Sequence, residues 1–344
     1  MKTQFHAFLK RLGLLCIAAS QLLVGAVLIW FGLRIIVGDQ LLFVRMMSYL
    51  LPWLFMGLGV SLGIAIVARW WRLAVLTSLL LIPFLYQFGP MFLPRQPVVH
   101  VGDAACQLRV MSYNVNLKNE DNIKHMAELI RAQSPDILAL QEMVPKVGQP
   151  LQAELQADYP YQQVDETPWL VRVVMSRYPI QTTSSQLNDE RVQQVLIETP
   201  AGPVMVFNLH PPPAITGGWV DQHQIFQLVA QVVSETDEPI LLLGDFNSTP
   251  FSQNYYLIDN LLTDIQTEVG QGFALTFPNV KKASTPERSW IARLILHTPP
   301  LVRIDHIFVS EQFRPISIEV LSETAGSDHY PQVAEVALDG CVAN

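Results

Sequence analysis

Three long apolar runs in the first 96 residues limit what this part of the chain can fold into. From Leu12 to Val37 the only polar interruptions are Ser20, Gln21 and Arg34, and two similar runs follow. A helix crosses a bilayer with about 20 apolar residues, and its backbone hydrogen bonds are all internal. We therefore predict that residues 1–96 form an all-α transmembrane segment, with helices at about 12–37, 43–67 and 73–93.

A cleaved signal peptide is the alternative interpretation of the first run. The run is longer than the apolar core of a signal peptide, and two more runs follow it. Cys16 does not fit a lipid-attachment cysteine, because the bulky Leu15 precedes it where a small residue is expected. Three uncleaved spans are the better interpretation.

The basic residues around the three runs favour one orientation. If the amino terminus is cytoplasmic, one side of the membrane carries Lys2, Lys10, Arg11, Arg69 and Arg72, and the other carries Arg34, Arg45 and Arg95. The side with more Lys and Arg is usually cytoplasmic. We therefore expect a multi-pass membrane protein of the bacterial inner membrane type, with the residues after Arg95 on the periplasmic, extracytoplasmic side.

The remaining residues, 97–344, carry the opposite charge. They hold 14 basic and 29 acidic side chains, whereas residues 1–96 hold eight basic side chains and one acidic side chain, Asp39. Affinity for nucleic acid depends on clustered Lys and Arg that displace counterions from phosphates. The acidic balance makes nucleic acid the weaker prediction for the substrate.

Four consecutive aliphatic residues, Ile240 to Leu243, are followed by Gly244 and are typical of a short strand buried on both faces. Asp245 and Asn247 come at its exit, two residues apart, so both side chains can point into one cleft. Such a pair can hold a water molecule and a phosphate oxygen. Because Asp, Asn, Ser, Thr and Pro are also ordinary turn formers, this stretch alone leaves both interpretations open.

Several other aliphatic-rich segments end in the same kinds of side chain. The residues at these six ends are Asn114, Glu142, His210, Asp245 with Asn247, Asp305, and Asp328 with His329. Each one alone is explained by a turn, a helix cap, a solvated carboxylate or a structural histidine. Carboxylates and amides bind hard cations and histidines move protons, so six such ends together predict one site.

Seven motifs in order resemble the endonuclease/exonuclease/phosphatase superfamily, which includes deoxyribonuclease I and neutral sphingomyelinases. They span roughly residues 107–339 and read Ser112-Tyr113-Asn114, Leu140-Gln141-Glu142, Ser176-Arg177-Tyr178-Pro179, Asn208-Leu209-His210, Gly244-Asp245-Phe246-Asn247, Ile304-Asp305-His306-Ile307 and Ser327-Asp328-His329-Tyr330-Pro331. The resemblance implies that residues 97–344 form a catalytic domain of the α/β (α+β) class. The implied fold is a four-layer α/β sandwich of two mixed β-sheets, with the site at one edge of both.

The resemblance also implies a metal-dependent cleavage of phosphoester bonds. Mg²⁺, or Mn²⁺, prefers oxygen ligands, and the predicted ligands are Asn114, Glu142 and Asp328. No cysteine and histidine cluster in the sequence indicates zinc.

The predicted catalytic residues are His210, Asp245, Asn247, Asp305 and His329. His329 is expected against the phosphorus atom, with Asp305 orienting its ring and raising its pKa. Asp245 would align or deprotonate the attacking water, and Asn247 would hold a phosphate oxygen. His210 would bind phosphate or protonate the leaving group.

The residues around the motifs bear on the substrate. Residues 279–302 mix basic side chains with large apolar ones such as Trp290, which suits either a loop that enters a lipid headgroup layer or a packed surface loop. Asn116 stands where some nucleases carry an aspartate. The predicted partners are a lipid bilayer and a lipid-linked phosphate ester or pyrophosphate, with no protein partner. A nuclease is the alternative, and an inactive binding domain is the third interpretation.

Two of the three cysteines flank the first and last predicted strands of the catalytic domain. In the superfamily these strands are antiparallel neighbours, so Cys106 and Cys341 are candidates for a disulfide in an oxidising compartment. Two free thiols are the alternative. Extending the pairing of these cysteines along the strands predicts that Asn114 lies opposite Val333.

Overall fold

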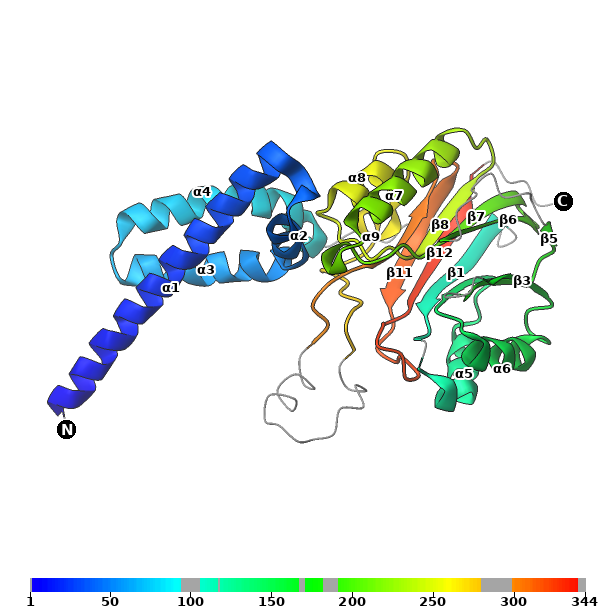
Figure 1. The fold of residues 1–344 in the computed structure, drawn as a ribbon, viewed down its shortest axis with the longest axis horizontal. Coiled ribbons are helices and arrows are strands. Elements are labelled where there is room, and N and C mark those ends of the chain that lie inside the picture. The colour runs from blue at the N-terminus through cyan, green and yellow to red at the C-terminus, as the bar shows by residue number, and fades with distance from the viewer. Residues whose placement is uncertain are drawn as a thin grey trace. The chain divides into compact units, whose positions relative to one another are not determined.

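Two units make up the chain, Met1–Pro94 and Arg95–Asn344. The computed structural model describes residues 2–93, 106–116, 118–166, 171–181, 191–279 and 299–339. Helices form the first unit, and strands with covering helices form the second (Figure 1). Most of the predicted lipid-facing loop, residues 280–298, lies outside the described residues, and so does Cys341.

The first unit contains helices long and apolar enough to cross a membrane. Two helical stretches meet this criterion singly, Gln4–Gln40 and Trp71–Phe92. The helices of the unit are α1 (Lys2–Val37), η1 (Gly38–Gln40), α2 (Leu42–Tyr49), α3 (Leu51–Val67), α4 (Trp71–Phe88) and η2 (Gly89–Phe92).

The predicted second span is bent by 74° between α2 and α3. Pro52 occupies the first turn of α3. Proline has no backbone N–H and its ring collides with the carbonyl four residues earlier, so a continuous helix through this point is disfavoured. Residues 42–67 therefore contain two helices, which meet the length and composition criterion for a membrane span only together, as a bent pair.

Two six-stranded sheets form the second unit. The first has the order β11-β12-β1-β2-β4-β3, with strands β1 (Gln107–Asn114), β2 (Ile137–Gln141), β3 (Tyr161–Glu166), β4 (Val171–Ser176), β11 (Phe313–Val320) and β12 (Gln332–Leu338). The second has the order β5-β6-β7-β8-β10-β9, with strands β5 (Ile180–Gln181), β6 (Val192–Thr199), β7 (Gly202–Leu209), β8 (Ile240–Asp245), β9 (Thr263–Asp264) and β10 (Asp305–Val309). Both are mixed, because β1–β2 and β7–β8 are parallel and the other pairs are antiparallel.

Three apolar layers hold the sheets and helices together. Residues such as Val110, Leu241 and Ile307 fill the space between the sheets. The outer face of the first sheet packs against α5 (Ile123–Gln133) and α6 (Pro145–Leu155). The outer face of the second packs against α7 (Trp219–Ser234) and α8 (Gln253–Asp259), and the short α9 (Ile265–Glu268) follows β9. The predicted four-layer α/β sandwich is confirmed (Figure 1).

The predicted register of the first and last strands is wrong by three residues. β1 and β12 are antiparallel neighbours, but Met111 lies opposite Val333, and the pairing ends with Ser112 opposite Gln332. Cys106 takes part in a disulfide bond. Cys106 precedes the first paired residue of β1, and its predicted partner Cys341 lies outside the described residues, so the cysteines do not define the register of the paired residues.

Candidate active site

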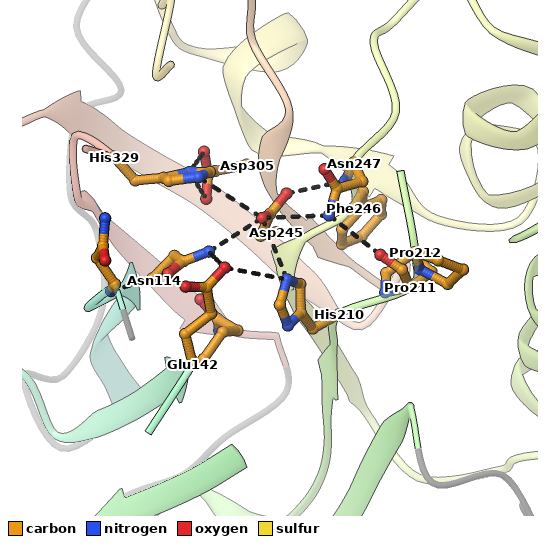
Figure 2. Close-up of polar contacts among 12 residues, drawn as sticks. Asn114, Glu142, His210, Pro211, Pro212, Asp245, Phe246, Asn247, Asp305 and His329 are labelled. Atoms are coloured by element: carbon orange, nitrogen blue, oxygen red, sulfur yellow. Dashed lines mark hydrogen bonds and ion pairs between the residues drawn. The ribbon is translucent and has the colours of Figure 1, made fainter. Parts of the chain in front are cut away.

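The predicted site residues lie at one end of the central strands of both sheets. Asn114 ends β1 and Glu142 follows β2 in the first sheet, whereas His210 follows β7, Asp245 ends β8 and Asp305 begins β10 in the second. Side chains alternate along a strand, so Asn114, His210, Asp245 and Asp305 continue the rows that fill the space between the sheets. Glu142 does not, because Ile137 and Ala139 form that row on β2. Figure 2 shows Asn114, His210, Asn247 and His329 grouped around Asp245.

Asp245 is the centre of the cluster and is 1% exposed. Its Oδ2 accepts a hydrogen bond from Nδ2 of Asn114 at 3.1 Å and lies 3.4 Å from Nε2 of His210 and 3.7 Å from Nε2 of His329. Its Oδ1 accepts from the backbone N–H of Asn247 at 2.8 Å. Burial acts to raise the pKa of Asp245, but His329, His210 and that N–H outweigh it and lower the pKa to about 2. Asp245 is therefore ionised.

The turn that presents Asp245 and Asn247 depends on Gly244. Its φ is 146°, and a Cβ here would lie 2.1 Å from the carbonyl oxygen of Leu209. Only glycine permits this close approach of β8 to β7, which brings Asp245 next to His210. Asn247 has a φ of 46°, and its Nδ2 donates to the carbonyl oxygen of Pro211 at 3.0 Å.

His329 and Asp305 form a buried pair. Nδ1 of His329 lies 2.9 Å from Oδ2 and 3.2 Å from Oδ1 of Asp305. Burial acts to lower the pKa of His329, but Asp305, Asp245 and Asp328 outweigh it and raise the pKa to about 10. The ring therefore stays protonated at neutral pH, and its Nε2 faces Asp245.

Glu142 is the more exposed acidic group of the cluster. Its side chain is 22% exposed, and Oε1 accepts from Nδ2 of Asn114 at 3.2 Å and lies 3.8 Å from Nε2 of His210. The backbone of Glu142 has a φ of 60°, which turns the chain away from β2 directly after the buried Gln141. Backbone strain of this kind is concentrated at functional sites.

Asp328 is the one predicted residue for which the described contacts give no direct link to the others. Its Oδ1 accepts from Nδ2 of Asn116 at 2.6 Å, and its carboxylate influences the pKa of His329 from nearby. Asn116, with a φ of 67°, occupies the position where an aspartate occurs in some nucleases. Asp328 is thus held beside the cluster by an amide donor.

The oxygen-rich corner formed by Asn114 and Glu142 fits a hard divalent cation. The amide N–H of Asn114 points between the carboxylates of Glu142 and Asp245, and a flipped amide would present an oxygen at the same place. Carboxylate and amide oxygens are the ligands that Mg²⁺ prefers. Asp245, Asp305 and His329 also bring ligand atoms within 4.8 Å of one another. Since the His329 ring holds a proton and bonds Asp305, that trio is better suited to proton handling.

Three residues that the sequence interpretation missed support the pair of His329 and Asp305. The ring of Phe277 lies 4.7 Å from the His329 ring. Oγ1 of Thr276 accepts from the backbone N–H of Asp305 at 3.3 Å. Ser327 donates to the carbonyl oxygen of Asn114 at 2.6 Å and accepts from the N–H of His329 at 3.0 Å. Ser327 lies within a quoted motif, whereas nothing in the local sequence distinguishes Thr276 and Phe277.

Comparison with known proteins adds to this geometry. Residues 111–329 match the model of the endonuclease/exonuclease/phosphatase family. The chain belongs to this family. No curated protein sequence matches the chain.

Solved structures share the fold of the endonuclease/exonuclease/phosphatase family. A family protein from Bacteroides thetaiotaomicron is 19% identical, with a TM-score of 0.54 over 71% of this chain and 100% of that one. A truncated TDP2 from Caenorhabditis elegans is 15% identical, with a TM-score of 0.51 over 67% and 97%. A mannosyl-6-phosphatase from Bacteroides thetaiotaomicron is 19% identical, with a TM-score of 0.51 over 67% and 100%.

Proposed function

We propose that this chain is a membrane-anchored, divalent-metal-dependent phosphoesterase whose favoured substrate is a lipid-linked phosphate ester or pyrophosphate. The observation that carries the proposal is the buried cluster in which an ionised Asp245 meets Asn114, His210 and a protonated His329. Such a cluster can bind a phosphoryl group, because its hydrogen-bond donors stabilise the phosphate oxygens and its carboxylate orients the water.

The side chains divide the work of hydrolysis by their charge. His329, kept protonated by Asp305, donates from Nε2 to a nonbridging oxygen of the phosphate. Asp245 orients the attacking water, and its low pKa makes it a weak base. His210, at the rim beside Glu142, binds the phosphate or protonates the leaving oxygen.

Glu142 and Asn114 are the proposed metal ligands, with Asp328 beside them. A divalent cation bound there would neutralise charge on the phosphate oxygens. Mg²⁺ retains several waters, so one carboxylate and one amide suffice as protein ligands.

The acidic balance of residues 97–344 and the apolar helices support a lipid-linked substrate over nucleic acid. Binding of nucleic acid gains from clustered Lys and Arg, and this unit holds 14 basic against 29 acidic side chains. Anchoring through α1, α3 and α4 would keep the site close to amphiphilic phosphates. An inactive binding domain is disfavoured, because each motif keeps its ionisable or amide side chain.

The helical unit also supports the proposed orientation. Gly57 of α3 contacts Leu23 of α1, since a Cβ on Gly57 would lie 2.9 Å from Cδ2 of Leu23. The two helices are antiparallel (Figure 1). Arg11 lies 12 residues before Leu23 and Arg69 lies 12 residues after Gly57, so both lie at a similar distance from this contact along the helix axes. Lys10 and Arg72 adjoin them, which places four cations at one end of the helices. We propose that this end is cytoplasmic and that the catalytic unit is periplasmic.

The full chain, purified in detergent, provides the test. We expect phosphate or headgroup release from phosphorylated lipids with Mg²⁺ or Mn²⁺, and loss of release after chelation. Glu142→Gln keeps the shape of the side chain but removes its charge, and should abolish the activity without changing the melting temperature. Rapid nicking of supercoiled DNA with no lipid turnover would instead establish the nuclease alternative.

A further inference from the structure

The loop between His210 and α7 exposes apolar side chains next to the cluster. Ile215 and Val220 are 38% and 57% exposed, and the indole of Trp219 is half-buried and stacks on His223 with ring centroids 5.3 Å apart. We call the following five residues the apolar ledge: Pro212, Pro213, Ile215, Trp219 and Val220.

The apolar ledge is fixed to the cluster by hydrogen bonds. Nε2 of the buried Gln222 donates to the carbonyl oxygens of Pro212 and Asn247, both at 2.9 Å. Asn247 in turn donates to the carbonyl oxygen of Pro211 at 3.0 Å. Figure 2 shows Pro211 and Pro212 beside His210 and Asn247. The ledge therefore keeps its place relative to Asp245 without a ligand.

Gly218 closes the loop tightly. A Cβ at this position would lie 3.0 Å from Cβ of Pro212. Three consecutive prolines at 211–213 further restrict the backbone. A rigid surface loses little conformational entropy when a ligand binds, which favours affinity.

The stretch of sequence that contains the apolar ledge offers no Lys or Arg to a polyanion. Residues 192–280 contain no Lys or Arg and nine Asp or Glu side chains. A phosphate chain that left the cluster on the His210 side would therefore meet no cationic side chain from this stretch of the protein. An uncharged apolar group there would instead cover Ile215 and Val220.

We propose that the apolar ledge binds the hydrocarbon chain of an amphiphilic phosphate substrate while its phosphate lies at Asp245 and His210. The inference rests on the proposed function and names the substrate class more narrowly. The ledge is continuous with the cluster, because only Pro211 separates it from His210 and Asn247 donates a hydrogen bond to Pro211. Ile215 follows His210 by five residues in the chain.

The experiment compares two synthetic diesters, 4-nitrophenyl methyl phosphate and 4-nitrophenyl octyl phosphate, with the full chain in detergent and Mg²⁺. The two substrates present the same scissile bond and differ in the chain. Each fully buried methylene raises affinity up to about fourfold, and an open ledge covers only one side of a chain. We expect kcat/KM for the octyl diester to exceed that for the methyl diester by about tenfold.

A double variant, Ile215→Ser with Val220→Thr, should reduce this ratio to about two, mainly through KM of the octyl diester. Leu261→Ser is the matched control, since Leu261 is 43% exposed and precedes β9, which pairs with Val309 at the end of β10 far from Asp305. Its ratio should equal that of the wild type. Partition of the octyl diester into micelles is the same for every variant, so it cancels when the octyl-to-methyl ratios of the variants are compared.

The outcomes separate the two proposals. If the wild type hydrolyses both diesters at the same kcat/KM, or if the double variant keeps the tenfold ratio, the ledge does not bind the chain and the phosphoesterase proposal stands. If neither diester nor any phosphorylated lipid is hydrolysed, the proposed function fails and this inference fails with it.

Discussion

In the proposed mechanism His329 carries a proton, although burial acts to lower the pKa of its ring. Asp305 and Asp245 compensate, because their carboxylates lie 2.9 and 3.7 Å from its two ring nitrogens. We expect His329→Gln, which cannot carry this charge, to lower kcat by about 10²–10⁴-fold. His125→Gln is the control, since that ring is 54% exposed on α5. Retained turnover by His329→Gln, with an unchanged melting temperature, would remove His329 from the mechanism.

The dependence of activity on pH follows from the same pair. Asp305 raises the pKa of His329, so in the wild type the protonated ring is lost only as the pH approaches about 10. Asp305→Asn removes the charge but keeps a hydrogen-bond acceptor, and should move the basic limb of kcat/KM downward by about 1–3 pH units. Profiles between pH 6 and 10.5 provide the measurement, and coincident basic limbs would contradict the assignment.

At the scale of elements, two buried hydrogen bonds made by Asn208 join the two sheets directly below the cluster. Nε2 of Gln141, at the end of β2, donates to Oδ1 of Asn208 on β7 at 2.8 Å, and Asn208 donates to the carbonyl oxygen of Leu140 at 3.0 Å. Gln141 precedes Glu142, and Asn208 lies two residues before His210. These two hydrogen bonds therefore help to set the separation of Glu142 and His210 across the sheets.

We expect Asn208→Ala to lower the free energy of unfolding by about 1–3 kcal/mol, because Gln141 loses its buried partner. The rate should also fall, since displacing catalytic groups by about 1 Å can reduce it 100-fold. A double-mutant cycle with Gln141→Ala, measured by urea unfolding and by kcat, tests both effects. Additive changes in kcat would show that the bridge has only a structural role.

A second buried group links β10 to the turn after β8. Nε2 of His306 lies 2.8 Å from the carbonyl oxygen of Ser248, and burial lowers the pKa of His306 to about 3, assisted by Arg303. The unfolded state has a pKa near 6.5 and binds a proton first, so this residue reduces stability as the pH falls from about 6.5 toward 3. Above pH 6.5 it has no such effect.

The variant His306→Gln keeps a donor for Ser248 but does not titrate. We expect the wild type to lose about 1 kcal/mol more stability than the variant for each pH unit between 6 and 4. Urea unfolding of the full chain in detergent at a series of pH values gives the difference directly. Parallel curves for the two proteins would mean that His306 is not buried in its neutral form.

Elements with strong local signals were predictable from the sequence. The aliphatic run Ile240–Leu243 became β8, and the apolar residues Ile123, Met126, Leu129 and Ile130 have the spacing of one helix face, as α5 has. No local helical pattern predicted α6, because Gly148 and Pro150 interrupt it, yet the packing of Val147 and Leu151 on the first sheet stabilises this helix. The strand register was wrong because it depended on cysteines outside the ladder.

The candidate site was predictable where polar residues end buried strands, as for Asn114 and Asp245, whereas Asp305 begins β10 instead of ending a strand. These positions are fixed by strand alternation, which is a local property. The contributions of Thr276 and Phe277 were not predictable, because Thr276 contacts Asp305 and Phe277 contacts His329 from a segment held by the isolated pairing of Phe277 with Val302. Such a contact between distant segments leaves no periodic pattern in either one.

At the scale of the whole molecule, the proposed topology depends on the two ends of the helical unit. One end carries Lys10 and Arg11 at the level of Arg69. At the other end Arg34 is paired with Asp39 at 2.7 Å, and Arg45 donates to the carbonyl oxygen of Asp39, also at 2.7 Å. Lys10, Arg11 and Arg69 have no acidic residue near them in the sequence. They lie at the end assigned to the cytoplasm, which is the side on which positive charge is retained during insertion.

Labelling of introduced cysteines in intact cells tests this topology. Gln4→Cys marks the amino terminus, and Glu319→Cys marks an exposed position on β11 of the catalytic unit. The parent chain is the control, since Cys16 lies within the first apolar run and Cys106 is disulfide-bonded. We expect a membrane-impermeant maleimide to label Glu319→Cys in intact cells and Gln4→Cys only after lysis. The reverse pattern would place the catalytic unit in the cytoplasm, where the phosphoesterase could still act on lipids of the inner leaflet. Labelling of both positions in intact cells would require an even number of spans.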